Sequence, residues 1–233
     1  TRLALQSFPT PLMGRNLMAH IRSDFTVRIR RSAFNPSLPS DLDTAALLVR
    51  GLASTSARIH LQITASAHPD NSDTTTPVPN DFGSYINLSP FESDEFGAPR
   101  AYIQLNLGQN DFQTWNEMDQ TTVELAQQLA GNPSNGQPPN IEYLYDGRWQ
   151  TTPFPLSRPF PGWRRGLGTT YHEAGTLWMG SDSSSSVTNE LGRFHHIQNA
   201  YACDQSVFPT VGSVNPVLTG LVLARQLAEE LAS

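Results

Sequence analysis

Lysine is absent from this sequence, in which all fifteen basic residues are arginine. A Schiff-base lysine, a pyridoxal phosphate enzyme and a Walker A phosphate loop all need a lysine side chain, so the absence excludes these three kinds of site. The net charge of −6 also argues against an extended nucleic-acid surface, because phosphate binding needs a concentrated positive field. We expect a small molecule as the partner.

Cysteine and long apolar runs are also scarce. Cys203 stands alone, so no disulfide can form within the chain, and its apolar neighbours predict a buried, unreactive thiol. No apolar run approaches the ~18 residues of a membrane span, and residues 1–10 lack the pattern of a signal peptide, so neither a membrane anchor nor a localisation can be read. Because the chain begins at Thr1 without a methionine, we expect a processed or excised piece of a longer product.

Strand-like patterns dominate the first part of the chain, whose 233 residues suit one large domain or two small ones. Apolar and polar residues alternate at 25–30, 58–63, 86–88 and 102–107. One apolar and one polar face on each strand are typical of an antiparallel sheet packed on one side, with the polar face available to line a pocket. The segment 68–81 is rich in Pro, Asp, Thr and Ser, which predicts a long flexible loop.

A helix and a hairpin are predicted next along the chain. Asp111 is a suitable N-cap, and apolar residues at helical spacing continue to Ala130, where Gly131 follows as a stop signal. This helix is expected to back the sheet. The pair Asp146-Gly147, between apolar runs at 141–144 and 148–150, predicts a two-residue hairpin.

The chain ends in a further predicted helix. Asn215 is a good N-cap, and Pro216 suits the first helical position because it has no amide hydrogen to leave unsatisfied. A broad apolar face then predicts that this helix is buried; it comprises Leu218, Leu221, Val222, Ala224, Leu227, Ala228 and Leu231. The free N–H groups and partial positive charge at its N-terminus suit a group that becomes negative.

Four segments resemble motifs of the glucose-methanol-choline (GMC) family of flavin-dependent alcohol oxidoreductases. The run YHEAGTLWMG at 171–180 is similar to H-x-x-G-T-x-x-M-G, and NAYACDQSVFPT at 199–210 is similar to N-L-Y-V-x-D-x-S-x-F-P. NPVLT at 215–219 matches the start of the family's last helix, and GRNLMAH at 14–20 resembles G-x-N-L-x-x-H. The resemblance covers almost the whole chain, strongly at its end and weakly between about 32 and 160.

The resemblance implies an α+β fold, with an antiparallel sheet backed by helices and a C-terminal strand and helix that return to complete an FAD-binding α/β domain. It implies a linking segment at 1–24, a substrate-binding domain at 25–165, and the catalytic motif with the C-terminal part of the FAD domain at 166–233. FAD is the implied cofactor, and an alcohol or sugar is the implied substrate. The implied partner is an N-terminal FAD-binding segment or chain, without nucleic acid, membrane anchor or metal.

The resemblance also assigns roles to individual residues. His172 is the implied base for the hydroxyl proton, a task that suits the pKa of histidine, and Asn215 is implied to donate its amide to the substrate oxygen. A helix cap competes with this second role, because an asparagine that caps its own helix cannot freely turn the same amide to a substrate. His20 matches a motif position and is assigned a structural role. The implied flavin contacts are the backbones of Asp204 and Gln205, together with Pro216 and the Val217 amide.

Other functions stay open at this point. No G-x-G-x-x-G follows an N-terminal strand, so the chain is alternatively a noncatalytic substrate-binding module or remnant of the family that cannot hold FAD alone. A His-Glu hydrolase is a more distant alternative, since no G-x-S-x-G elbow is present. A metal site at His172, His195 and His196 is not favoured, because adjacent histidines project differently. Neither the alcohol nor the electron acceptor can be named, so oxidase and dehydrogenase both stay open.

Overall fold

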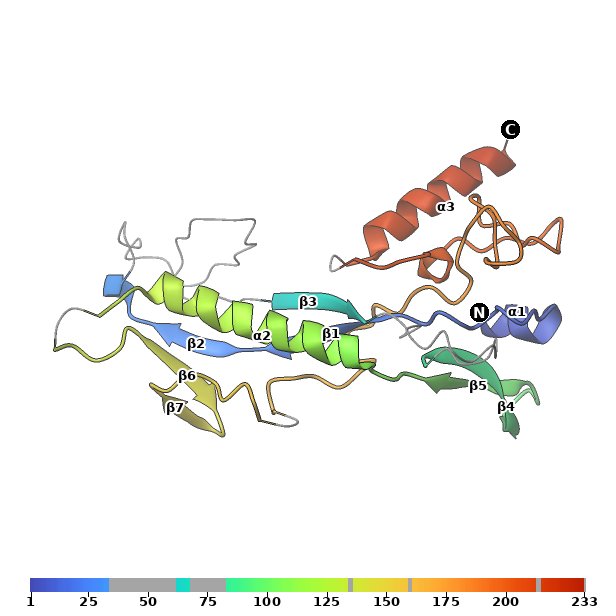
Figure 1. The fold of residues 1–233 in the computed structure, drawn as a ribbon. Coiled ribbons are helices and arrows are strands. Elements are labelled where there is room, and N and C mark those ends of the chain that lie inside the picture. The colour runs from blue at the N-terminus through green and yellow to red at the C-terminus, as the bar shows by residue number, and fades with distance from the viewer. Residues whose placement is uncertain (34–61, 68–82, 134–135, 159–160, 213–214, 233) are drawn as a thin grey trace. The chain divides into compact units, whose positions relative to one another are not determined.

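The structure is a computed structural model that describes residues 1–33, 62–67, 83–133, 136–158, 161–212 and 215–232 (Figure 1). Its contacts divide the chain into two units. The first comprises Thr1–Ile21, Ala65–Gln113 and Leu167–Ser233, and the second comprises Arg22–Thr64 and Thr114–Gly166. Each unit is therefore assembled from segments that are distant in sequence.

The secondary structure is a mixture of short strands and helices. In chain order the elements are α1 (Arg2–Ser7), β1 (Ala19–Asp24), β2 (Thr26–Ile29), the 3₁₀ helix η1 (Arg31–Ala33), β3 (Gln62–Ala67), β4 (Tyr85–Ser93), β5 (Pro99–Gln104), α2 (Gln109–Ala130), β6 (Ile141–Tyr145), β7 (Arg148–Gln150), the 3₁₀ helix η2 (Gln205–Val207) and α3 (Val217–Leu231). Within the described ranges the strands form three small sheets with the orders β1-β3, β2-β6-β7 and β4-β5. The predicted mixture of helices with antiparallel strands is confirmed, although the strands do not form one sheet.

The second unit is an antiparallel sheet covered by a helix. β6 pairs antiparallel with β2 on one side and with β7 on the other, and the register places Thr26 opposite Leu144 and Ile29 opposite Ile141. α2 runs along this sheet (Figure 1). The core between them is formed by Val123, Ala126, Ala130, Ile141, Tyr143, Phe154 and Trp163. The ring of Phe154 meets those of Phe25, Tyr143 and Trp163 edge to face, with centroids 4.8, 5.3 and 5.2 Å away.

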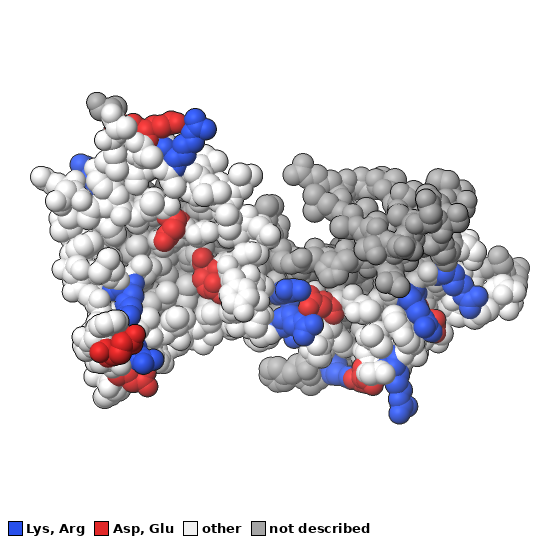
Figure 2. All heavy atoms as spheres, turned by 180° about the vertical axis from the view of Figure 1, so that it is seen from behind, with Lys and Arg blue, Asp and Glu red and all other residues white. Residues whose placement is uncertain are grey.

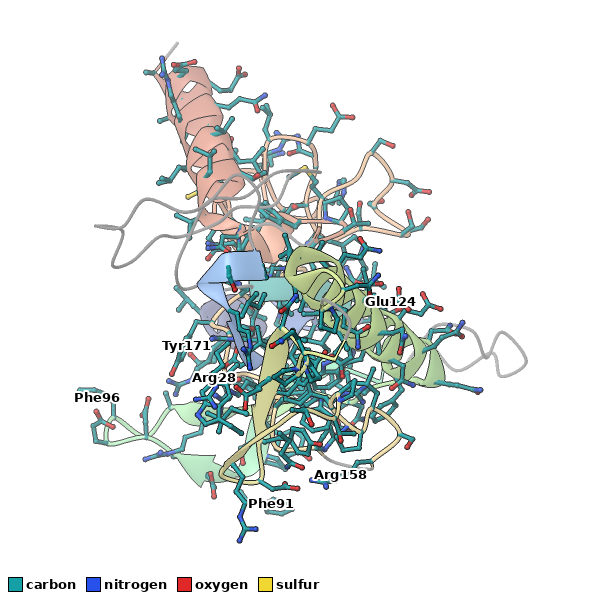
Figure 3. The ribbon with its side chains drawn as sticks, turned by 90° about the vertical axis from the view of Figure 1, so that its left-hand side faces the viewer. Arg28, Phe91, Phe96, Glu124, Arg158 and Tyr171 are labelled. Atoms are coloured by element: carbon teal, nitrogen blue, oxygen red, sulfur yellow. The ribbon has the colours of Figure 1, made fainter. Side chains whose placement is uncertain are left out.

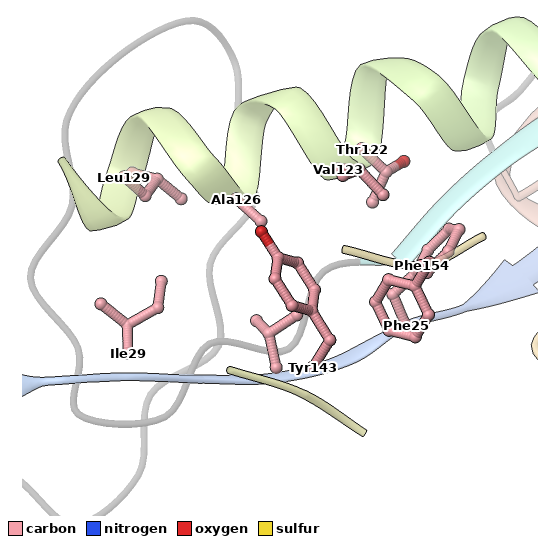
Figure 4. A pocket seen from close by; sticks show the side chains of 9 residues that line it. Phe25, Ile29, Thr122, Val123, Ala126, Leu129, Tyr143 and Phe154 are labelled. Atoms are coloured by element: carbon pink, nitrogen blue, oxygen red, sulfur yellow. The ribbon is translucent and has the colours of Figure 1, made fainter. Parts of the chain in front are cut away.

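A narrow gap remains in this core (Figure 4). Side chains of α2, including Val123 and Leu129, face Ile29, Phe25 and Tyr143 across a space of about 20 Å³. That volume holds about one water molecule, and the apolar walls offer a water few hydrogen-bond partners. The gap is therefore a packing imperfection between helix and sheet, not a ligand site.

The sequence predictions for this unit are largely confirmed. The strand at 25–30, the helix to Ala130 and the hairpin are all present. α2 starts two residues before Asp111, whose Oδ2 accepts from the Gly108 N–H at 2.9 Å from within the first turn. Asp146 and Gly147 both have positive φ, at 52° and 72°, as a two-residue turn between twisted strands requires.

A buried carboxylate connects the parts of the second unit. Asp119, in α2, is fully buried, and its oxygens accept from Ser23 Oγ at 2.5 Å, Trp163 Nε1 at 3.3 Å and Arg164 Nε at 2.8 Å. Ser23 Oγ in turn accepts from Trp115 Nε1 at 2.8 Å. Each donor in the network is satisfied by an acceptor, so the charge of the Asp119 carboxylate is tolerated inside the core. The same hydrogen bonds connect α2 to β1 and to the segment around Trp163.

We predict that Asp119→Asn destabilises the protein by about 2–4 kcal/mol, because the amide leaves the Arg164 charge uncompensated and presents hydrogens to groups that are themselves donors. Urea unfolding would measure the loss. The matched control is Glu142→Gln, which neutralises the exposed ion pair with Arg28 and should leave the unfolding midpoint unchanged. Equal effects of the two substitutions would contradict a special role for the buried network.

The first unit carries the β4-β5 hairpin and α1, which packs beside β4. Ile86 and Leu88 of β4 pack against a core that contains Leu5, Met13 and Phe194, which confirms the alternation predicted at 86–88. The predicted strand at 102–107 is wrong in extent and orientation, since β5 ends at Gln104 and Ile103 is exposed. The reason is that β5 pairs only with β4, and no described residue buries its outer face.

The tip of the hairpin is also apolar at the surface. Phe91 and Phe96 lie at the outside of the molecule (Figure 3) and are almost fully exposed. Two other predictions in this region concern residues beyond the described part: the loop at 68–81, and the strand at 58–63 apart from residues 62 and 63, which belong to β3.

The predicted burial of the C-terminal helix is wrong. Only Gly220 and Leu227 of α3 are buried, whereas the exposed apolar side chains are Val217, Leu218, Leu221, Val222 and Leu231. α3 contacts η2, and Leu223 packs against the cluster that includes Met18 and Phe208. No described residue covers the remaining apolar face, so the side chains whose spacing predicted burial are exposed.

Cys203 is exposed, which corrects the prediction of a buried thiol. Its neighbour Ala202 is the residue that packs against the core, while Cys203 faces solvent.

Charges of both signs are interspersed on the face shown in Figure 2, as expected from ion pairs such as Arg2 with Asp94 at 2.7 Å. None of the helices in the described ranges has the length and apolar character needed to cross a membrane.

Candidate active site

Three of the segments with motif-like sequences lie side by side in the first unit. Met18 and Ala174 exchange both backbone hydrogen bonds, at 3.0 and 2.9 Å, as in an antiparallel bridge. On its other side the same segment donates from Leu177 N–H to Ser206 O at 2.7 Å and from Met179 N–H to Val207 O at 2.8 Å. The backbone at 174–179 is therefore held between the segments at 14–20 and 205–207.

Gly175 makes this close pairing possible. Its φ of +91° belongs to a region that side chains disfavour, and a Cβ atom there would lie 2.4 Å from the Asn16 backbone oxygen. The Gly175 N–H donates to Gln205 O at 3.1 Å, so the residue contacts both flanking segments. Only glycine satisfies these conditions without moving the backbone.

We predict that Gly175→Ala lowers the free energy of unfolding by at least about 2 kcal/mol more than Gly97→Ala does. Gly97 is the matched control, since it also has positive φ, +79°, but a Cβ there meets nothing within 4 Å. The control isolates the backbone strain, about 1–2 kcal/mol, and the difference measures the clash with Asn16. Equal losses in urea unfolding would show that the close approach is not needed.

A pair of histidines lies beside this ladder. His20, in β1, is 1% exposed, and its Nδ1 lies 2.9 Å from Nδ1 of the half-buried His172. The two rings meet edge to face, with centroids 4.8 Å apart. His20 Nε2 lies 2.7 Å from the Gly212 carbonyl oxygen. Burial lowers the pKa of His20, and nearby His172 lowers it further, whereas the Gly212 carbonyl and the Glu173 carboxylate act in the opposite direction.

A pocket of about 440 Å³ opens at the start of α3, a volume within the ~300–1,000 Å³ that is usual for small-molecule sites. Its walls are mainly apolar, with Thr210, Asn215 and Thr219 as polar groups. The full lining is Met179, Phe208, Pro209, Thr210, Val211, Gly212, Asn215, Pro216, Thr219 and Leu223. Because Gly212 both lines the pocket and contacts His20, the histidine pair is linked to the pocket wall.

The residues around the start of α3 lie at this pocket. Asn215 is exposed and Pro216 is buried, and both belong to the lining. The prediction that Asn215 occupies the N-cap is wrong, because α3 begins at Val217 and the cap position is taken by Pro216, whose φ of −79° and ψ of −12° are already helical. The first helical bond runs from Gly220 N–H to Pro216 O at 3.0 Å. Pro216 has no side-chain acceptor, and among the described residues the Asn215 side chain makes no capping bond to α3 that would compete with substrate binding.

Asp204 and Gln205 lie next to α3 in the same unit. Asp204 caps η2, accepting at Oδ1 from the Ser206 N–H at 2.8 Å and from the Ser206 hydroxyl. The Gln205 side chain lies against Gly220, where an added Cβ would be 3.6 Å from its amide carbon. The Asp204 carboxylate therefore stabilises this turn.

The sequence model described as GMC oxidoreductase matches residues 79–224, which is more than half of the chain. The chain belongs to the GMC oxidoreductase family. 5-(Hydroxymethyl)furfural oxidase from Methylovorus sp. (strain MP688) is 32% identical to it over 69 residues, which are 29% of this chain and 13% of that protein. The crystal structure of pyridoxine 4-oxidase from Mesorbium loti covers 94% of this chain with 43% of its own, at 16% identity and a TM-score of 0.48. This GMC oxidoreductase chain spans less than half the length of either relative.

Two features of this GMC oxidoreductase site were not anticipated. His20 was assigned a structural role, but it contacts the predicted base directly; its place in the GRNLMAH segment was the available signal. Tyr171, labelled in Figure 3, precedes His172 with φ of 57° and is 86% exposed. An aromatic residue with a left-handed backbone conformation is rare, and residues in this conformation tend to occur at functional sites. No pattern in the sequence indicates this conformation at Tyr171.

Proposed function

We propose that this chain supplies the catalytic part of an FAD-dependent oxidoreductase that oxidises CH–OH groups, and that it acts together with an N-terminal FAD-binding segment. The observation that carries the proposal is the junction of the His20–His172 pair, through Gly212, with a mainly apolar pocket at a helix N-terminus. Family membership supports the reaction class, and the pocket supplies surroundings in which that reaction can run.

The residues around this pocket fit a flavin. The first turn of α3 presents backbone N–H groups without helical partners and the positive end of the helix dipole, both suited to a ring edge that gains negative charge. Val217 N–H is the proposed donor, with the backbones of Asp204, Gln205 and Pro216 as further contacts. FAD, if held by these groups, would supply the acceptor for the hydride that leaves the alcohol carbon.

His172 and Asn215 act on the substrate in this proposal. His172 takes the hydroxyl proton at Nε2, the ring nitrogen that is not in contact with His20. Asn215 donates its side-chain amide to the substrate oxygen and so holds the carbon in position, which its exposed place on the pocket wall allows.

The exposed face of α3 supports the proposed FAD-binding partner. Leu218, Leu221 and Val222 form an apolar surface on a helix whose N-terminus belongs to the site. Contiguous apolar surface of this kind usually marks an interface. A segment that supplies the rest of the flavin site would cover this face, which is consistent with the chain spanning less than half of its relatives.

We predict that His172→Ala, in the FAD-loaded protein, slows flavin reduction at saturating alcohol by about 100-fold or more, because no other group takes the proton. Stopped-flow absorbance would measure this rate. His195→Ala is the matched control, since His195 is also half-buried but bonds Ser186 at 2.8 Å instead of His20. An unchanged rate in His172→Ala would remove His172 from the mechanism.

A second prediction concerns Asn215→Asp, which keeps the shape of the side chain but replaces its donor with a negative charge. Because Asn215 is exposed and does not cap α3, the stability should change by less than about 0.5 kcal/mol. Flavin reduction should slow by about 100-fold, the usual cost of losing one donor to a developing oxyanion. Asn132→Asp, at an exposed position in the other unit, controls for the added charge. Retention of the full rate would restrict Asn215 to a structural role.

The alternative is a noncatalytic substrate-binding module of the same family. It is motivated by one observation, that no G-x-G-x-x-G follows an N-terminal strand in this sequence. In this alternative the pocket binds the alcohol without flavin, and the His172 and Asn215 substitutions alter binding but no redox rate.

A further inference from the structure

The hydrogen positions in the histidine pair follow from the one partner that cannot donate. The Gly212 carbonyl oxygen is only an acceptor, and His20 Nε2 lies 2.7 Å from it. His20 therefore carries a hydrogen on Nε2. This fixes one end of a chain of three groups, Gly212, His20 and His172.

The second contact holds a single hydrogen between two nitrogens. His20 Nδ1 and His172 Nδ1 are 2.9 Å apart, a hydrogen-bond distance that requires one of them to donate and the other to accept. If His20 is neutral, its remaining nitrogen has a lone pair, and the hydrogen belongs to His172. If His20 is an imidazolium, the reverse holds.

Burial decides between these two states. His20 is 1% exposed, and the cation would have to be desolvated with only two neutral acceptors, the Gly212 carbonyl and His172 Nδ1, and no carboxylate in direct contact. The groups that act on its charge are His172, which disfavours the cation, and Glu173, which favours it; with burial as the largest influence, the pKa of His20 is lowered. His20 is consequently neutral near pH 7.

We propose that His20 is a positioning residue that holds His172 in the tautomer with hydrogen on Nδ1, so that Nε2 presents a lone pair. The assignment of the tautomer stands on the contacts of this chain alone. What the lone pair then does, accepting the hydroxyl proton of an alcohol, rests on the proposed function. A base held in the wrong tautomer is costly: in the serine-protease triad, changing the group that sets it lowers kcat by about 10⁴-fold.

The same contacts also set the direction of the His172 ring. The two imidazoles cross at 79°, and His20 is itself held by β1 and by Gly212. A ring anchored at Nδ1 points Nε2 away from His20. His20 thus sets both the tautomer and the ring orientation of His172.

The direct test is the ¹⁵N spectrum of histidine side chains in the FAD-loaded protein labelled with ¹⁵N-histidine. Two-bond ¹H–¹⁵N correlations distinguish a nitrogen that bears hydrogen from one with a lone pair, and His172→Ala and His20→Asn identify the signals. We expect His172 with hydrogen on Nδ1 and a lone pair on Nε2, and His20 with the opposite pattern. Hydrogen on His172 Nε2 at pH 7, or an imidazolium at His20, would overturn the proposal.

Two substitutions separate positioning from packing. In His20→Asn, the side-chain oxygen sits near the position of Nδ1 and can accept from His172, so the tautomer and most of the flavin reduction rate should be retained. In His20→Leu no acceptor remains, so His172 should lose its single tautomer and the rate should fall by about 10- to 100-fold. An unaltered His172 signal in a folded His20→Leu protein would contradict the assigned role. If that variant does not fold, the wild-type and His20→Asn spectra still decide.

Different results would contradict the proposed function of His172 and the proposed positioning role of His20. If His172→Ala leaves flavin reduction unchanged, the proposed function of His172 is wrong, whatever tautomer the spectrum shows. If the spectrum shows hydrogen on His172 Nε2 while His172→Ala abolishes reduction, His172 is the base but His20 does not set its tautomer.

Discussion

The close approach of two backbones at Gly175 is the constraint on which the rest of the site depends. Because this residue has no Cβ, the segment at 174–179 can pair with Met18 on one side and with residues 205–207 on the other. The first pairing brings β1, and with it His20, beside His172. The second places η2, whose end leads towards α3, along the same segment. His172, His20 and one wall of the pocket are therefore brought together by main-chain contacts.

The proposed function places two requirements on α3. Its N-terminus would stay open to a ligand, while its apolar side chains need to be covered. In the described part of α3, Gly220 and Leu227 are buried and Leu223 and Ala224 are partly buried, whereas the large apolar side chains of Val217, Leu218, Leu221, Val222 and Leu231 are exposed. A segment that both covers this face and completes the pocket would meet both requirements. Under the proposed function, one FAD-binding segment would account for both the exposed apolar face and the open pocket.

The sequence predicts the local structure of the second unit well, because its signals are local. The alternation at 25–30, the helical spacing before Ala130 and the Asp146-Gly147 turn each act over a few residues. The site is harder to predict, since His20 and His172 are 152 positions apart in the sequence and no periodic pattern of residues indicates that they are in contact. Motif resemblance located His172 and Asn215, but it did not indicate that Pro216 would take the helix cap or that His20 would face the base. The burial of α3 was predicted wrongly because the sequence shows that the helix has an apolar face but does not show which residues pack against it.

The central claim is that this chain forms part of a flavin site. The most direct test is the absorbance spectrum of the protein purified from its native source, together with its intact mass and a search for a co-purifying N-terminal segment. The account predicts flavin bands at about 380 and 450 nm, with the FAD-binding segment present in the same polypeptide or as a tightly bound fragment. A folded, colourless protein that lacks such a segment and binds no added FAD would contradict it, and would identify the chain as a substrate-binding remnant of the family.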